Sequence, residues 1–173
     1  MWRRPPLQFE SLTLLRRAFL AAAFGWALLL PLATFAASRT PPARAWHALA
    51  FLIYSAGSVV CHQLPARSFE LWSTQMPVCA RCTGIYLGGA VMAIASLFRL
   101  RPDWATPVLD ARHSRYALAA AALPTAVTLA FEWITGNVPS NLMRAASGLP
   151  LGIVVVVVIL GTFGERDRVA PTV

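Results

Sequence analysis

The sequence contains five apolar stretches, each close to the length that a helix needs to cross a lipid bilayer. They cover residues 18–38, 46–63, 80–98, 116–135 and 145–163. A helix rises about 1.5 Å per residue, so about 20 apolar residues span a hydrocarbon core of roughly 30 Å. Only 13% of the residues are charged and 57% are hydrophobic, which is too apolar for an ordinary soluble domain. We therefore expect an all-α fold, a polytopic transmembrane bundle of about five helices in the cell membrane.

The first stretch allows two interpretations. Arg16 and Arg17 precede it, and Thr34-Phe35-Ala36 follows its apolar run, as in a twin-arginine export signal with a cleavage site. We favour a first transmembrane helix, because four further spans already commit the chain to the membrane; four helices would remain if the segment were cleaved. Either interpretation places the N-terminus in the cytoplasm. We divide the chain into one integral-membrane domain, with a basic segment at 1–17 and a short polar tail at 164–173.

The positive charge of the chain comes from arginine alone. The formal net charge is +8 and no lysine is present. The arginines lie at the ends of the apolar stretches, where they anchor helices, and they form no basic stripe with interleaved aromatic residues. The pattern excludes nucleic acid as a partner and favours the bilayer, with an anionic lipid or phosphate group beside the arginines. Five alternating spans would place seven arginines on the N-terminal side and eight on the other, so only the first helix indicates the orientation.

Two connectors, 64–78 and 136–144, lie on the same side of the membrane if all five stretches span it. In that arrangement both lie on the N-terminal side. The second stretch is short, so we expect its helix to continue through Cys61 and His62. Glycine pairs Gly84/Gly88 and Gly148/Gly152 begin the third and fifth stretches, at a spacing that lets helices pack closely. Polar residues from four helices are expected to converge beside these pairs: Cys61, His62, Arg67, Cys79, Arg81, Cys82, Glu132, Asn141 and Arg144.

The cysteines suggest a metal site. Cys79 and Cys82 stand two residues apart at the start of a helix, and Cys61 with His62 would complete three sulfurs and one imidazole, a set typical of tetrahedral zinc. Neighbouring helical side chains point about 100° apart, so Cys61 and His62 seldom bind one ion together. The fourth ligand is therefore His62, Glu132 or water. We expect a metal ion, with zinc first, and we expect Arg67, Arg81, Glu132, Asn141 and Arg144 to contact a bound group.

Three other interpretations stay open. The Cys79/Cys82 pair suits thiol-disulfide exchange, with Cys61 as a third thiol and a membrane quinone as electron acceptor. The arginines suit an enzyme or carrier that handles a phosphate-bearing lipid, which leaves open whether the protein is an enzyme. The cysteines could also be inert small hydrophobic residues in a membrane core.

Two motifs resemble the signature of a family of small prokaryotic membrane proteins of unknown function. The first is Cys61-His62-Gln63-Leu64-Pro65, and the second runs from Pro77 through Cys79-Ala80-Arg81-Cys82-Thr83-Gly84 to Gly88. Asn141, Arg144, Gly148 and Gly152 resemble a weaker motif of the same family, and Glu132 stands near the place where we expect an aspartate. The resemblance implies a helical membrane protein and supplies no activity.

Overall fold

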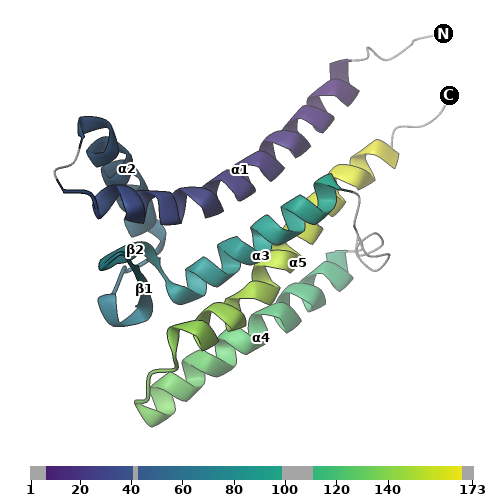
Figure 1. The fold of residues 1–173 in the computed structure, drawn as a ribbon. Helices are drawn as coiled ribbons and strands as arrows, with labels where there is room; N and C mark the ends of the chain where they lie inside the picture. Colours follow the sequence, from purple (N-terminus) through teal and green to yellow (C-terminus); the bar gives the residue numbers. More distant parts are fainter. Residues whose placement is uncertain (1–6, 41–42, 99–110, 169–173) are drawn as a thin grey trace, which may run out of the picture.

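The computed structural model describes residues 7–40, 43–98 and 111–168, with side chains for 14–40, 43–98 and 112–162. The described chain forms five α-helices, one 3-10 turn and one small hairpin (Figure 1). In chain order these are α1 (Leu7–Ala37), α2 (Arg44–Val60), η1 (Pro65–Arg67), β1 (Ser68–Leu71), β2 (Thr74–Cys79), α3 (Ala80–Leu97), α4 (Ala111–Thr135) and α5 (Asn141–Arg168).

Four of the described helices, α1, α3, α4 and α5, are long and apolar enough to cross a membrane. They run side by side, with α3 between α1 and α5 and with α4 packed on the other side of α5 (Figure 1). Leu20 of α1, Met92 of α3 and Val156 of α5 meet in one buried cluster. The predicted helical membrane bundle is confirmed, with four described helices of sufficient length and apolar character to cross a bilayer.

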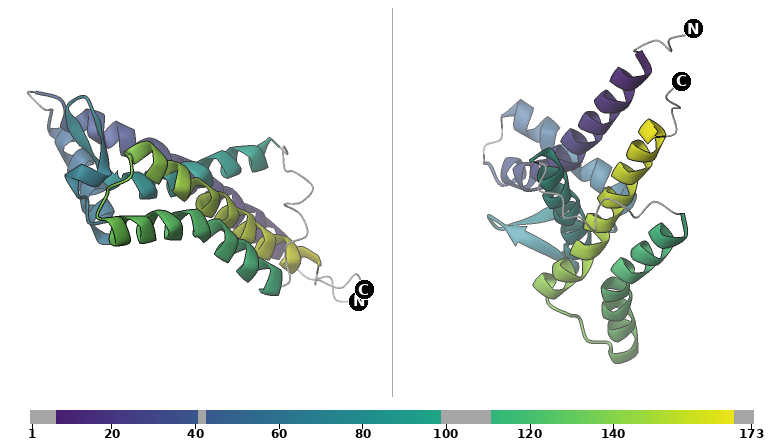
Figure 2. Two further views of the ribbon diagram at one scale, coloured as in Figure 1. Left: turned by 90° about the horizontal axis from the view of Figure 1, so that it is seen from below. Right: turned by 90° about the vertical axis from the view of Figure 1, so that its right-hand side faces the viewer.

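Helix α2 departs from the prediction. It ends at Val60, and the extended backbone of Cys61 (φ −146°, ψ 137°) closes it, so it does not continue through His62. Its 17 residues cover about 25 Å. Ile53 of α2 and Cys61, the residue after the end of α2, pack against the same short segment of α1, at Leu30 and Ala33. Helix α2 therefore crosses the end of α1 instead of running along it (Figures 1 and 2), and it is not among the four candidate membrane spans of the described chain.

This crossing changes the topology of the bundle. Helix α1 ends where α3 and α5 begin, at what we call the hairpin end, and α1 begins where α5 ends, at the opposite end (Figure 1). The connector between α2 and α3, which contains β1 and β2, and the connector between α4 and α5 do share the hairpin end, as predicted. That end lies across the bundle from the beginning of α1, whereas five spans would have placed the two together. The difference arises because α2 lies across the end of α1 (Figure 1) and is not among the candidate spans of the described chain.

The hairpin occupies the connector between α2 and α3. Strands β1 and β2 pair antiparallel with Leu71 opposite Thr74, and Trp72 and Ser73 form the turn with φ of 51° and 57°. Positive φ at both central residues is the geometry of a two-residue hairpin turn. A two-stranded hairpin is marginal by itself. This one is stabilised because Met76 and Val78 are buried against α1 and α2.

The two predicted glycine pairs face each other across α3 and α5. A Cβ atom at Gly84 would lie 2.0 Å from the carbonyl oxygen of Ala145, and one at Gly152 would lie 1.9 Å from that of Ile85. Gly88 and Gly148 are equally tight against the opposite backbone. The absence of side chains at these positions is what lets the two helices approach, and it brings the first turns of α3 and α5 together.

Candidate functional site

Cys61, Cys79 and Cys82, which we call the thiol cluster, meet at the hairpin end. Their Sγ atoms all lie within 4.8 Å of one another, and the Sγ atoms of Cys79 and Cys82 are 3.5 Å apart. Cys61 follows the last turn of α2, Cys79 ends β2, and Cys82 lies in the first turn of α3. The cluster depends on the hairpin, because β2 places Cys79 beside the residue that ends α2.

The surroundings of Cys79 favour its thiolate. The backbone N–H of Cys79 donates to the Sγ of Cys61 at 3.1 Å, which connects the two residues directly. The contact with the Cys82 thiol is the main influence that lowers the pKa of Cys79 to about 5; the backbone N–H groups of Cys82 and Arg81 and the Cys61 thiol act in the same direction, against the opposing effect of burial. Cys79 is also the N-cap of α3, where the helix dipole stabilises negative charge.

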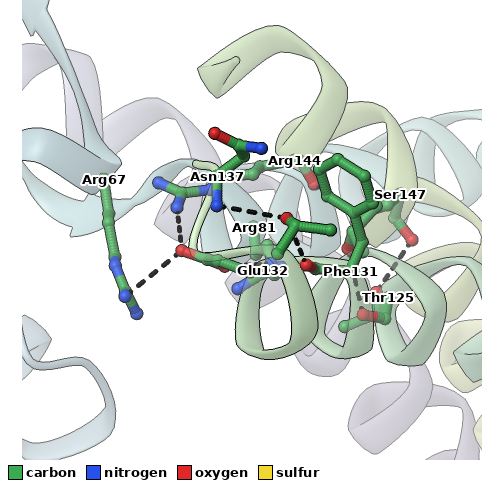
Figure 3. A network of polar contacts seen from close by, with 10 residues as sticks. Arg67, Arg81, Thr125, Phe131, Glu132, Asn137, Arg144 and Ser147 are labelled. Atoms are coloured by element: carbon green, nitrogen blue, oxygen red, sulfur yellow. Dashed lines mark hydrogen bonds and ion pairs between the residues drawn. The ribbon is translucent and has the colours of Figure 1, made fainter. Parts of the chain in front are cut away.

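A second polar group, the arginine-glutamate network, lies beside the thiol cluster. It consists of Glu132 and three arginines, Arg67, Arg81 and Arg144. Glu132 Oε2 accepts from Arg81 Nη2 at 2.9 Å, while Oε1 accepts from Arg144 Nη2 and pairs with Arg67 Nη2 at 3.2 Å (Figure 3). The side chains of Glu132 and Arg144 are 4% and 1% exposed. These contacts join η1, α3, α4 and α5 at one carboxylate.

Local structure explains how each member reaches this point. Arg81 lies in the first turn of α3 and Arg144 in the first turn of α5, whose N-terminus is capped by Ser140 Oγ accepting from the Met143 N–H. Glu132 lies in the last turn of α4, and Gly136, the residue after this helix, has a φ of 69°. A left-handed residue after a helix is a common way to end it, and here it turns the chain toward α5.

A cavity of about 330 Å³ lies between the thiol cluster and the arginine-glutamate network, and residues of both line it. Apolar side chains of Val60 and Leu64 stand at its margin and are 58% and 46% exposed. Its polar lining consists of Cys61, His62, Gln63, Arg67, Cys79, Arg81, Cys82 and Arg144. Thiols, an imidazole and guanidinium groups thus share one space of a size that is usual for small-molecule sites.

Most of the predicted site residues are brought together. The exceptions are two. His62 is exposed and lines the cavity, but it does not join the group of sulfur ligands found among the described residues. Asn141 begins α5 instead of lying in a loop, and its Nδ2 donates to the carbonyl oxygen of Ser68 at 2.8 Å, so it holds the hairpin and does not line the cavity. Arg144 likewise lies in α5 and not in the connector where it was expected.

Gln63 was not assigned a role from the sequence, although it stands in the Cys61-His62-Gln63 motif. Its Nε2 donates to the carbonyl oxygens of Tyr54 at 2.7 Å and Pro77 at 2.8 Å, and its carbonyl oxygen accepts from Gln75. Its φ of 48° bends the chain out of α2. Gln63 therefore positions β2 and the thiol cluster, and its place directly after two candidate ligands was the available signal.

Comparison with known proteins shows the family of the chain. An uncharacterized protein of Methanocaldococcus jannaschii is 34% identical over 121 residues, which cover 69% of this chain and 74% of that protein. An uncharacterized protein of Methanothermobacter thermautotrophicus is 34% identical over 95 residues, which cover 54% of this chain and 78% of that protein. No solved structure matches the chain. Residues 61–158, from the first cysteine into α5, match the family described as predicted membrane protein (DUF2085), and the chain therefore belongs to this family of membrane proteins.

Proposed function

We propose that the thiol cluster binds a metal ion, with zinc as the expected metal. The observation that supports this proposal is the convergence of three Sγ atoms within 4.8 Å of one another. Zinc bound at about 2.3 Å by tetrahedral thiolates holds its sulfur atoms roughly 3.8 Å apart. The 3.5 Å between the Sγ atoms of Cys79 and Cys82 is close to that separation. The N–H donated to Cys61 Sγ is a second favourable feature, because such bonds stabilise a coordinating thiolate.

The fourth coordination position would face the cavity. Glu132 is engaged by three arginines, so it is a poor candidate for the fourth ligand. His62 lines the cavity with the three cysteines, and water is the remaining candidate. Three protein ligands with one open position are typical of a zinc site that acts on a bound molecule, whereas structural zinc has four protein ligands. We therefore favour a site at which the metal contacts a small ligand.

Metal analysis of protein purified from membranes tests this proposal. We expect about one zinc per wild-type chain and almost none in the Cys79→Ser/Cys82→Ser variant, because a tetrahedral site does not survive the loss of two ligands. His62→Ala, compared with His47→Ala on α2, shows whether the imidazole is a ligand. Both histidines are exposed, so folding is expected to be kept in both variants. Less than ~0.3 metal per wild-type chain, or equal occupancy after the double substitution, contradicts the proposal.

Thiol-disulfide exchange is the second candidate. The short gap between the Sγ atoms of Cys79 and Cys82 favours it, because a modest side-chain rotation would bring them to the roughly 2.05 Å of a disulfide. Formation of that bond would release two electrons and two protons, which a quinone in the adjacent lipid would accept. Mass spectrometry of unreduced protein separates the two candidates: a Cys79–Cys82 disulfide without zinc supports exchange, and three free thiols with zinc support the metal site.

We also infer that the hairpin end faces away from the cytoplasm. In the described chain, six arginines lie in the helix turns near the opposite end: Arg16, Arg17, Arg112, Arg115, Arg166 and Arg168. Near the hairpin end lie five, Arg39, Arg44, Arg67, Arg81 and Arg144, and the last three of these pair with Glu132. Arginine is concentrated in cytoplasmic segments, so six arginines at the opposite end, against two at the hairpin end that remain outside the network, favour an N-terminus in the cytoplasm.

Side-specific labelling tests this orientation. In a chain whose native cysteines are replaced by serine, Asn137→Cys marks the hairpin end and His113→Cys marks the opposite end; both positions are exposed. We expect a membrane-impermeant maleimide to label Asn137→Cys in intact cells and His113→Cys only after permeabilisation. The reverse pattern would support five spans with a cytoplasmic N-terminus and would refute the inferred orientation.

A further inference from the structure

The arginine-glutamate network carries more positive charge than its own carboxylate neutralises. Three guanidinium groups surround one carboxylate, so the network keeps a net charge of two positive units. Arg81 and Arg144 are 12% and 1% exposed, and both lie in the first turns of helices that are candidate membrane spans. Uncompensated charge on buried side chains of such helices is costly unless an anion approaches it.

The network also holds donors that the protein does not use. Arg81 Nε, Arg144 Nε and Arg144 Nη1 are buried and have no hydrogen-bond partner. Buried polar groups in folded proteins nearly always have a partner, so three unpaired donors at one site require an explanation. Both arginines line the 330 Å³ cavity, and so does Arg67 of η1, whose side chain is 40% exposed and points toward Glu132 (Figure 3).

We propose that the cavity binds a phosphate-type oxyanion through Arg67, Arg81 and Arg144. Guanidinium groups match such anions because they donate parallel N–H bonds to two oxygens at once. Glu132 holds the three arginines together, and Arg67, whose side chain is 40% exposed, is the most accessible of them to an entering anion. The proposal goes beyond the metal site and does not rest on it, because the arginines are positioned by Glu132 and not by the thiol cluster.

Either of two sources could supply this anion. The exposed apolar side chains of Val60 and Leu64 at the margin would suit the acyl chains of a phospholipid whose headgroup occupies the cavity. A free phosphate-type anion would enter from the aqueous side by the same route. The recognition chemistry is identical in both cases, so the binding experiment needs one arm for each source.

Binding is measured with wild-type protein in nanodiscs. In one arm the nanodiscs contain only phosphatidylcholine and radiolabelled inorganic phosphate is added; in the other, protein is extracted from mixed phosphatidylcholine and phosphatidic acid and the retained lipid is counted. We expect saturable binding in at least one arm. Binding of phosphate identifies a free anion, and retention of phosphatidic acid alone identifies a headgroup; either result supports the proposal.

Three variants show whether the arginines are responsible. Arg67→Gln and Arg81→Lys are expected to weaken binding about tenfold or more, the first by removing a charged donor and the second by replacing a fork with a point charge. Arg39→Gln is the matched control, because it removes one charge at the hairpin end, where Arg39 stacks 4.1 Å over the Phe35 ring and not in the cavity. It is expected to change binding less than about twofold.

The outcomes that overturn the proposal are specific. They are no saturable binding of either probe to wild-type protein, wild-type affinity in folded Arg67→Gln, or an equal loss in Arg39→Gln. The Cys79→Ser/Cys82→Ser variant keeps this test separate from the metal site. We expect it to lose zinc and still bind the anion, so absence of zinc in wild-type protein would refute the metal proposal alone.

Discussion

Glu132→Gln is expected to destabilise the protein by about 3–5 kcal/mol, because it removes the carboxylate that the three arginines of the network share. The substitution keeps the shape of the side chain but leaves three guanidinium groups facing one another. Arg144, which is 1% exposed, cannot turn toward water to compensate. The loss is measured as the change in unfolding free energy in bicelles under increasing sodium dodecyl sulfate.

The matched control for this substitution is Glu70→Gln, which removes a carboxylate at the hairpin end from an exposed position on β1. We expect it to change the unfolding free energy by less than about 0.5 kcal/mol. The double variant Glu132→Gln/Arg67→Gln is expected to be more stable than the sum of its single changes predicts, because it removes one of the stranded charges. Equal stability of Glu132→Gln and the wild type would show that the network does not stabilise the fold.

Gly152→Ala is the second substitution with a large expected effect. Its Cβ atom would lie 1.9 Å from the carbonyl oxygen of Ile85, which belongs to helix backbone and cannot turn aside. Helices α3 and α5 must therefore separate, at an expected net loss of about 1–3 kcal/mol, which exceeds the gain of up to about 1 kcal/mol from alanine's higher helix propensity. The same unfolding measurement in bicelles detects it.

Gly25→Ala on α1 is the control, because nothing lies within 4 Å of the Cβ atom that it would add. It is expected to be neutral or to stabilise the protein by up to about 1 kcal/mol. If Gly152→Ala were as stable as Gly25→Ala, close contact between α3 and α5 would not be needed for the fold. The same separation would move Arg144 away from Arg81, so Gly152→Ala is also expected to weaken the site that these arginines form.

The relation between the glycine pairs and the arginines follows from their order along the helices. Arg81 precedes Gly84 by three residues, and Arg144 precedes Gly148 by four, so each arginine lies about one turn beyond the closest helix contact. The carbonyl oxygen of Arg81 is itself the atom that a Cβ at Gly148 would meet, at 2.4 Å. The close packing of α3 and α5 therefore also positions Arg81 and Arg144. For this reason a substitution outside the cavity lining, such as Gly152→Ala, is expected to affect the site.

Much of the helical framework could be predicted from the sequence, because hydropathy identifies the segments that are apolar enough to lie in a bilayer. The third stretch was expected at 80–98, and α3 covers Ala80–Leu97. Cys79 and Cys82 were expected at the beginning of a helix, where they are the N-cap and a first-turn residue of α3, and the glycine pairs were expected beneath the polar residues. The stretch was predicted from hydropathy along one helix, and the cysteine and glycine pairs from residues within one or two turns, where local spacing determines which side chains share a face.

Hydropathy could not decide whether an apolar helix of intermediate length runs along the other helices or packs across them. The 17 residues of α2 are apolar enough to resemble a span, but its path is set by contacts with Leu30 and Ala33 of α1 and with β2. The hairpin was equally hidden. Its turn is Trp72-Ser73 and not one of the Asn-Gly or Asp-Gly pairs that mark such turns in a sequence.

The sequence by itself determined the membrane-spanning character of the chain, the positions of most helices and the residue types available for a site. Only the tertiary structure decided that α2 crosses the bundle, that the hairpin brings Cys61 to Cys79, and that Glu132 joins three arginines. The physical reason is distance along the chain. Arg81 and Glu132 are 51 residues apart, and no local pattern of hydropathy or spacing specifies a contact that depends on how whole helices pack.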